Sequence, residues 1–332
     1  MNEWDIKHQN SRRKQIYELY RKYMFDKLDD DLNWYGKERK IGFREIMWHC
    51  LPLLDGDERS ITRANRIIEG VSLKVCHFTP MTSLQILLKY KDRLTKKVID
   101  KLENYIKDSL PAAASDNIHF TMYNDNFATM NTFTLLVAGE MFGDKEIFNA
   151  GMKKLNQLKE VLMRCGTIME YCSATYTPVS THTLAEMVNY VKDSEAKNLA
   201  RQCEERMWAE IATHYHAPTA HLAGPHSRAY MIDSVGHPHN LASFLYLVFG
   251  EKVFINPVND LFPPHKQQVI HCGLEILMWP NSVWLCSGDC HCPDYLADIF
   301  LNKTFPYSVI TTSECLPSPE YIYEDSELEY PA

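Results

Sequence analysis

The amino-acid sequence predicts a mainly α-helical protein of packed helical hairpins, and three observations support that prediction. The 332 residues include only 13 glycines and 16 prolines, which disfavours a turn-rich β-sandwich. Apolar residues recur at steps of three and four in one segment after another, from residue 12 to about residue 301. Segments that are apolar on all sides alternate with segments that are apolar on one face, which is typical of inner and outer helices in stacked hairpins.

The individual helices follow from this spacing. Residues 195–213 form the clearest one-sided helix, with Ala196, Leu199, Cys203 and Met207 on a single face. Residues 144–163 repeat the pattern, with Asp144 as a candidate N-cap, and residues 126–142 are apolar nearly all round, as in a buried helix. Further helices are predicted over 61–72, 81–89, 92–110, 181–191, 239–249 and 265–278. Residues 285–312 mix short apolar runs with Cys, Pro and Gly, so an irregular C-terminal part is expected.

Composition and charge narrow the class of protein. We expect one helical-hairpin domain over residues 1–303 and an extended, acidic, proline-containing tail over residues 304–332. With 35 basic against 43 acidic residues and no basic run, a nucleic-acid partner is not expected. No secretory leader opens the sequence and no apolar run is long enough to cross a bilayer, so we expect no membrane partner and a cytoplasmic location. The ten cysteines are scattered along the sequence without the spacing of a disulfide framework, which is typical of reduced thiols. The oligomeric state is not indicated.

Histidines concentrate in one stretch that follows the helix ending near residue 213. Six of the 14 fall within 26 residues, where an even spread would place about one: His214, His216, His221, His226, His237 and His239. The same stretch holds Arg228, Tyr230 and Asp233. Imidazoles titrate near neutral pH, and a phenol can donate a proton. A guanidinium can bind a carboxylate through two hydrogen bonds. This long loop is therefore the first candidate site.

A metal or other cofactor is not expected. His214 and His216 would point to different sides of a helix, so a zinc ion at the histidine loop is possible only if the loop folds back. Cys286, Cys290 and Cys292 lack the paired spacing of a zinc knuckle, and thiols near a turn are the better interpretation.

A second polar segment separates two predicted helices. Residues 170–179 read EYCSATYTPV, and this mixture of aromatic rings, hydroxyls and a carboxylate suits sugar binding. The alternative is a well-capped turn, with Ser180 or Thr181 as N-cap. In residues 122–126, MYNDN, we expect Asn124 and Asn126 to cap the buried helix that follows. Dinucleotide, P-loop, hydrolase-elbow and zincin motifs are missing from the sequence.

The two polar segments together resemble a known architecture. The pattern E-Y-x-S-x-T-Y, then a helical hairpin, then L-A-G-P-H-S-R-A-Y is similar to poorly characterised (α/α)-toroid proteins, which resemble polysaccharide lyases and uronate-processing enzymes. The likeness covers about residues 124–233, and Cys172-Ser173-Ala174 stands where Asn-Ser-Pro would be expected. It implies a toroid or incomplete toroid of helical hairpins, with both polar loops at the mouth of a cleft, and a small-molecule or oligosaccharide ligand.

The resemblance implies sugar chemistry, and the first expectation is a lyase that cleaves a uronate-containing oligosaccharide by β-elimination. Such a reaction needs a group that neutralises the carboxylate, a base, and an acid for the leaving oxygen. Arg228 is the candidate neutraliser, His226 or His221 the base, and Tyr230 or Tyr176 the acid.

Four further residues are expected to bind substrate: Glu170, Asn126, Asp233 and His216. One alternative is a glycoside hydrolase on the same toroid, with Glu170 and Asp233 as its carboxylate pair. The other is a non-catalytic scaffold that binds a ligand or a protein.

Overall fold

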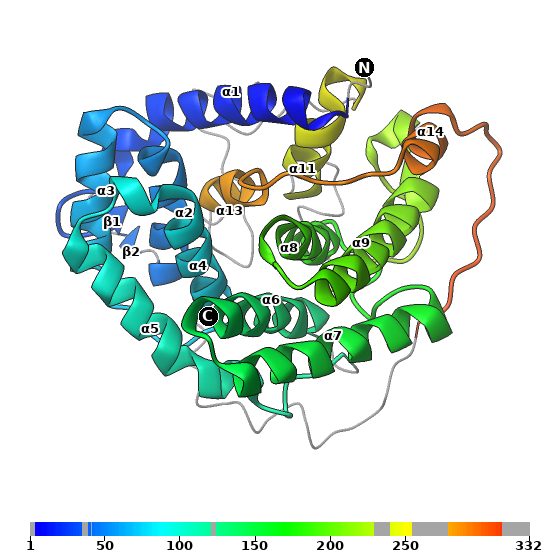
Figure 1. Cartoon of the computed structure of the whole chain (residues 1–332). Coiled ribbons are helices and arrows are strands. Elements are labelled where there is room, and N and C mark those ends of the chain that lie inside the picture. The colour runs from blue at the N-terminus through cyan, green and yellow to red at the C-terminus, as the bar shows by residue number, and fades with distance from the viewer. Residues whose placement is uncertain are drawn as a thin grey trace.

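The chain is mainly helical, as the sequence predicts. A computed structural model describes residues 4–34, 39–40, 42–120, 124–228, 240–253 and 278–313. Helices lying inward in Figure 1 are α2 (Phe43–Leu54), α4 (Phe78–Tyr90), α6 (Asp125–Phe142), α8 (Tyr176–Tyr190), α11 (Asn240–Phe249) and α13 (Met278–Leu285). Helices at the periphery are α1 (Ile6–Met24), α3 (Glu58–Gly70), α5 (Lys96–Ala114), α7 (Lys145–Cys165), α9 (Ser194–His214) and α14 (Asp294–Asn302).

The inner helices contact one another in a closed cycle. Helix α2 contacts α4, α4 contacts α6, and α6 contacts α8. Helix α8 contacts α11, α11 contacts α13, and α13 returns to α2. On the outside α3 contacts α5, α5 contacts α7, α7 contacts α9, and α9 contacts α14. The chain therefore winds in and out, so that each inner helix is enclosed by its neighbours.

Burial explains why the two kinds of helix have different sequences. Helix α6 buries every residue from Asp125 to Gly139, whereas α7 buries a single face that includes Leu155, Leu158 and Leu162. A helix enclosed on all sides must be apolar or internally hydrogen-bonded all round, and an outer helix needs only one apolar stripe. The predicted inner and outer character of these two helices is thus confirmed.

Close packing between α6 and α7 depends on glycine. A Cβ atom at Gly139 would lie 2.6 Å from the backbone nitrogen of Phe148, and one at Gly151 would lie 2.9 Å from the backbone nitrogen of Leu136. Gly143 ends α6 with φ +70°, and the Asp144 side chain accepts from the backbone of α7, as predicted.

Several predicted boundaries need correction. Helix α5 begins at Lys96, not at residue 92, because residues 91–93 form a 3-10 turn (η2, Lys91–Arg93) and the Thr95 side chain caps the helix at Val98. Helix α8 begins at Tyr176, so Ser180 and Thr181 lie inside it and neither is its N-cap. Helices α1, α2, α13 and α14 were not among the predicted segments, and α14 lies within the part that was expected to be irregular. The predicted helix 265–278 lies almost wholly outside the described residues, as does the tail from residue 314 onward.

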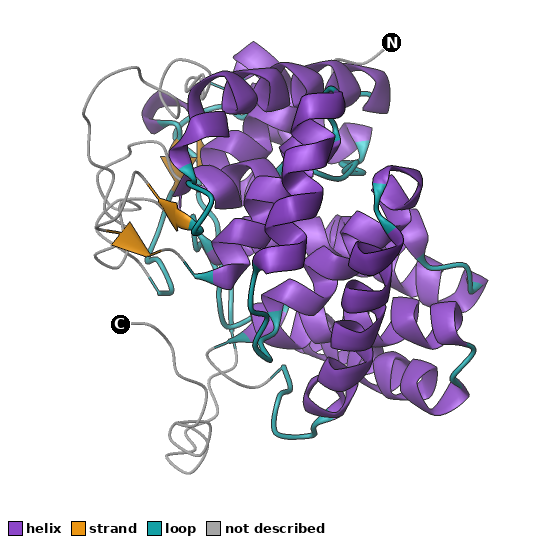
Figure 2. Cartoon of the chain, turned by 90° about the vertical axis from the view of Figure 1, so that its left-hand side faces the viewer, coloured by secondary structure: helices purple, strands orange, loops and turns teal. Residues whose placement is uncertain are grey.

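The described residues also form three short 3-10 helices, η1 (Phe25–Lys27), η3 (Ala217–Thr219) and η4 (Gly250–Lys252), and two short antiparallel strand pairs. Strand β1 (Asn33–Trp34) pairs with β2 (Arg39–Lys40), and β3 (Tyr215–His216) pairs with β4 (His221–Leu222). Figure 2 shows the strands together at one end of the helices, on the left of that view. Within the described part of the chain, none of the helices combines the length and apolar character that a membrane span requires.

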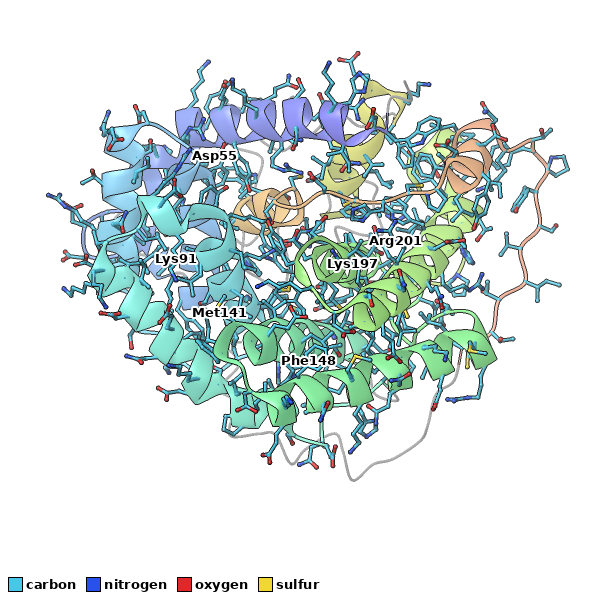
Figure 3. The ribbon with its side chains drawn as sticks, in the orientation of Figure 1. Asp55, Lys91, Met141, Phe148, Lys197 and Arg201 are labelled. Atoms are coloured by element: carbon cyan, nitrogen blue, oxygen red, sulfur yellow. The ribbon has the colours of Figure 1, made fainter. Side chains whose placement is uncertain are left out.

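The ends of the inner helices define two sides of the molecule. Asp55, Lys91 and Met141 lie at or just after the C-terminal ends of α2, α4 and α6, and Figure 3 labels them in the left half of the view. The N-terminal ends of α2, α4 and α6 contact one another through Arg44, Phe78 and Phe127. Phe78, the first residue of α4, packs edge-on against Phe127 near the start of α6, with ring centroids 5.9 Å apart. We call the end that carries these N-termini the mouth.

Candidate functional site

The loop between α7 and α8 is held in place by buried carboxylates. Glu210 of α9 accepts from the backbone nitrogen of Cys172 at 2.7 Å and also from the Thr167 hydroxyl. Asp125 of α6 accepts from the backbone nitrogen of Met169 at 2.6 Å. Because these acceptors come from neighbouring helices, the loop is fixed on both of its sides. Burial raises the pKa of Glu210 against the opposing effect of its hydrogen bonds.

Residues 226–228 run antiparallel against this loop. The Ser227 nitrogen donates to the Tyr171 carbonyl at 3.1 Å, and His226 Nδ1 lies 2.7 Å from the Cys172 carbonyl oxygen. The next pair in the same register is Arg228 with Glu170. Arg228 (φ 50°) and Cys172 (φ 48°) both adopt left-handed backbone conformations, which are unfavourable for such residues and are maintained by the surrounding contacts.

The Arg228 guanidinium donates hydrogen bonds to side chains of the loop between α7 and α8 and of the N-terminal ends of α6 and α8. Nη1 donates to Glu170 Oε1 at 2.8 Å and to the Asn124 side-chain oxygen, and Nη2 donates to the Tyr176 hydroxyl oxygen at 3.1 Å. The guanidinium also lies over the Tyr176 ring, 4.1 Å from its centroid. We call Asn124, Asn126, Glu170, Tyr176 and Arg228 the Arg228 cluster.

Glu170 is the fully buried anchor of the Arg228 cluster. Its carboxylate accepts from the Asn126 backbone nitrogen at 2.7 Å and from Asn126 Nδ2 at 2.7 and 2.8 Å, in addition to Arg228. Burial raises the pKa of Glu170, while Arg228 and Asn126 act in the opposite direction by favouring the charged form. Both oxygens are occupied by the protein's own donors, so this carboxylate holds Arg228 and the start of α6 in place.

The histidines near the cluster differ in accessibility. The carbonyl of Cys172 can only accept, so His226 carries its proton on Nδ1 in that contact, and a neutral ring then has its lone pair on Nε2. His226 is half-buried, whereas His221 is buried, and their rings meet edge-on with centroids 5.0 Å apart. His226 is therefore the better placed of the two to exchange a proton with a ligand.

The predicted site residues fall into three groups. Asn126, Glu170, Tyr176 and Arg228 meet in the cluster, and His226 and His221 adjoin the same loop. His216 is directed elsewhere among the described residues, because its Nδ1 meets the Thr219 hydroxyl and its ring packs edge-on against Phe305. Tyr230 and Asp233 lie outside the described residues.

Asn124 has a role that the sequence did not indicate. It occupies the N-cap position of α6 but makes no side-chain cap bond, and its oxygen accepts from Arg228 instead. Asn126 is also not a side-chain cap, because its amide nitrogen donates to Glu170. The expectation that these asparagines cap α6 is therefore wrong for their side chains.

A second polar group, missed from the sequence, occupies the interior. Gln85 and Lys89 of α4 both donate to Glu186 of α8, at 2.7 and 2.9 Å. Lys89 also donates to the Ser287 carbonyl at 2.7 Å, and Gln85 Nε2 lies 3.1 Å from His182 Nε2. We call these five residues the interior network. Burial acts to raise the pKa of Glu186, but Lys89 and His182 outweigh it and lower that pKa to about 2.

The segment 286–292 passes through this interior network. A Cβ atom at Gly288 would lie 2.0 Å from Glu186 Oε1, so only glycine fits there without displacing the carboxylate. Cys286 and Cys290 are buried free thiols and Cys292 is half-buried. Burial raises the pKa of the Cys286 thiol to about 12. Within the ranges that the structure describes, no three His, Cys, Asp or Glu side chains are grouped so that they could hold a metal ion.

An open recess lies away from the cluster. It measures about 880 Å³ and lies between α3 and the start of α5, where Asp57, Arg66, Glu69 and Arg93 are among its lining residues. It shares no residue with the Arg228 cluster.

Fold and site together define a mainly helical protein with an ion-paired polar cluster where inner helices begin. The family model described as "Domain of unknown function (DUF8769)" matches residues 74–271, and the chain belongs to this family. The matched residues include the whole Arg228 cluster. No match was found among curated proteins or among solved structures.

Proposed function

We propose that this protein is a carbohydrate-active enzyme that cleaves a uronate-containing oligosaccharide by β-elimination at the mouth of an (α/α) toroid. The closed cycle of contacts among the inner helices supports the toroid, since a closed inner ring with an outer layer is its defining arrangement. Ligands of helical folds of this kind bind where side chains from several inner helices converge. In this chain the N-terminal ends of α6 and α8 converge on Arg228.

The observation that carries the proposal is the contact between Arg228 and Tyr176. A guanidinium only donates hydrogen bonds, so the Tyr176 oxygen is the acceptor and the phenolic proton points to another group. The cation also stabilises the negative charge that develops on the phenol oxygen as this proton departs. Tyr176 is thereby suited to protonate the leaving oxygen of a glycosidic bond.

His226 supplies the base in this proposal. The proton removed in β-elimination lies next to the uronate carboxylate, and a neutral imidazole can accept it near neutral pH. The hydrogen bond from Nδ1 to the Cys172 carbonyl fixes the ring and leaves Nε2 as the accepting atom. Tyr176 follows this loop directly as the first residue of α8, so one segment positions both the base and the acid.

The Arg228 cluster is better suited to β-elimination than to glycoside hydrolysis. A glycoside hydrolase needs a carboxyl group that reaches the sugar. Glu170 is 0% exposed, and its oxygens are taken up by Asn126 and Arg228. Its role in this proposal is to position Arg228 rather than to react.

The test is an ultraviolet assay for the unsaturated uronate product against a panel of uronate-containing oligosaccharides. Tyr176→Phe should lower the rate by about 10²-fold or more with little change in thermal stability. The matched control is Tyr190→Phe, at the opposite end of the same helix. A Tyr176→Phe enzyme with the rate of the wild type would overturn the proposal, as would new reducing ends without the absorbing product.

A further inference from the structure

Arg44, in the first turn of α2, presents a guanidinium at the mouth. Its Nε donates to Glu45 Oε1 at 2.7 Å, and its guanidinium carbon lies 4.8 Å from the Phe78 ring centroid and 5.2 Å from that of Trp48. The side chain is 31% exposed. Within the described residues, neither terminal nitrogen of Arg44 has a hydrogen-bond partner. The guanidinium thus lies over two rings, while its terminal nitrogens are left for a ligand.

Arg44 and the Arg228 cluster share the same end of the fold. Phe78, beneath Arg44, packs against Phe127, which is the residue after Asn126 in the cluster. Burial acts to lower the pKa of Arg44, but Glu45, with smaller contributions from Cys76 and Tyr176, raises it above its ordinary value. The ring contacts place Arg44 at the end of the fold where the N-termini of α4 and α6 meet.

The two mouth arginines differ in what they can still bind. The Arg228 terminal nitrogens donate to Asn124, Glu170 and Tyr176, so most of the hydrogen-bonding capacity of this guanidinium is used within the protein. Among the described residues Arg44 bonds through Nε alone, and its two terminal nitrogens form the planar edge that pairs with a carboxylate through parallel hydrogen bonds.

Buried polar atoms without partners lie on the same side. Asn131 is 1% exposed, and its oxygen lies 3.0 Å from His77 Nδ1 while its Nδ2 has no partner. Asn126 is 0% exposed, and its side-chain oxygen likewise has none. Leaving this donor and this acceptor without partners among the described residues is unfavourable in a closed interior.

We infer that Arg44 binds the carboxylate of the acidic sugar and makes the site selective for uronates over neutral sugars. This inference rests on the proposed function and names the residue that recognises the acid. It assigns Arg228 to positioning Tyr176 and assigns substrate charge recognition to α2.

The experiment compares binding of methyl glucuronoside and methyl glucoside by ligand-observed NMR titration, which requires no turnover. The wild type should bind the acid more tightly by about tenfold or more, and Arg44→Gln should bring the two dissociation constants close to each other. The control is Arg59→Gln, because Arg59 also lies over a ring, 4.4 Å from the Phe25 centroid, and is 76% exposed. It should leave the preference unchanged.

A preference for the acid that survives in Arg44→Gln would overturn the inference, as would a wild type that does not distinguish the two sugars. If Arg44→Gln alone does not fold, the double variant with Glu45→Gln removes both charges and is used instead, because Glu45 is only 3% exposed. Loss of the preference without any elimination activity would support the inference and remove the proposed reaction. Elimination activity together with an unchanged preference for the acid in Arg44→Gln would support the proposed reaction and overturn the inference about Arg44.

Discussion

Lys89→Met tests how strongly the interior network holds the ring together. Glu186 is 0% exposed and accepts from Lys89, Gln85 and Asn189 at 2.9, 2.7 and 3.1 Å. Without Lys89 the carboxylate keeps only neutral donors in a closed interior. Removing one partner of a buried pair costs about 3–5 kcal/mol. The direction agrees, because Lys89 is the largest of the contributions that lower the Glu186 pKa to about 2 against the effect of burial.

The pH dependence of this prediction has a defined sign. Because the folded-state pKa of Glu186 lies below its unfolded value, the stabilisation is fully present above pH 4.5 and is lost as the pH falls toward 2. The cost of Lys89→Met should therefore shrink over that window. Burial lowers the pKa of Lys89, so the pair as a whole contributes less than the Glu186 shift alone indicates. Replacing both residues by methionine should recover most of the loss.

Urea unfolding followed by circular dichroism measures these differences. The matched control is Lys96→Met, since Lys96 is 84% exposed and pairs with Asp100 one turn away at 2.5 Å. It should change the free energy of unfolding by no more than about 0.5 kcal/mol. If Lys89→Met costs no more than this control, the interior network does not stabilise the fold and the reasoning is wrong.

Three further predictions follow from single contacts. Gly139→Ala should lower the melting temperature, at a cost of about 1–3 kcal/mol, because its Cβ would overlap the backbone of Phe148; an unchanged melt would contradict this. Asp193→Ala removes the side-chain cap of α9 and should cost about 1 kcal/mol in urea unfolding, whereas no loss would mean that the cap is dispensable. The pKa of His291 is lowered by burial and raised more strongly by Glu204, so wild-type stability should fall relative to His291→Gln as the pH rises above 6.5. Melts of the two proteins that run parallel across this range would refute the His291 prediction.

Outer helices could be predicted because their burial is one-sided, and α9 follows its predicted range within one residue at each end. The start of α8 could not be predicted, because its first turn contains Thr177 and Pro178 and its second turn contains Thr181 and Thr183. Proline is tolerated in a first turn, where its missing N–H would be unpaired in any case. Thr181 and Thr183 donate to carbonyls one turn earlier, which satisfies their hydroxyls inside a fully enclosed helix.

Residues of the candidate site could be predicted only where several polar or aromatic residues lie close together in the sequence. Glu170 and Tyr176 share one short segment, and Arg228 lies in the histidine-rich one, so local composition indicated them. Lys89 and Glu186 are 97 residues apart in the sequence. A single charged residue in a helix is typical of a solvent-exposed face, so the sequence did not indicate that these two form a buried pair. Arg44 likewise stands in a segment that was not predicted as a helix, and only its stacking on Phe78 reveals its place.

The segment 286–292 links the beginning of the chain to its last described helices. Gln9 of α1 donates to the Cys290 carbonyl and accepts from the Cys290 nitrogen, both at 2.9 Å, and Arg13 bonds to Asp289 at 2.6 Å. These contacts span more than 270 residues of sequence. At a translation rate of roughly 5–20 residues per second, α1 waits on the order of 15–60 s for its partners to be synthesised. These contacts can therefore form only after most of the chain has been synthesised, and the apolar surfaces that they cover are exposed to aggregation until then.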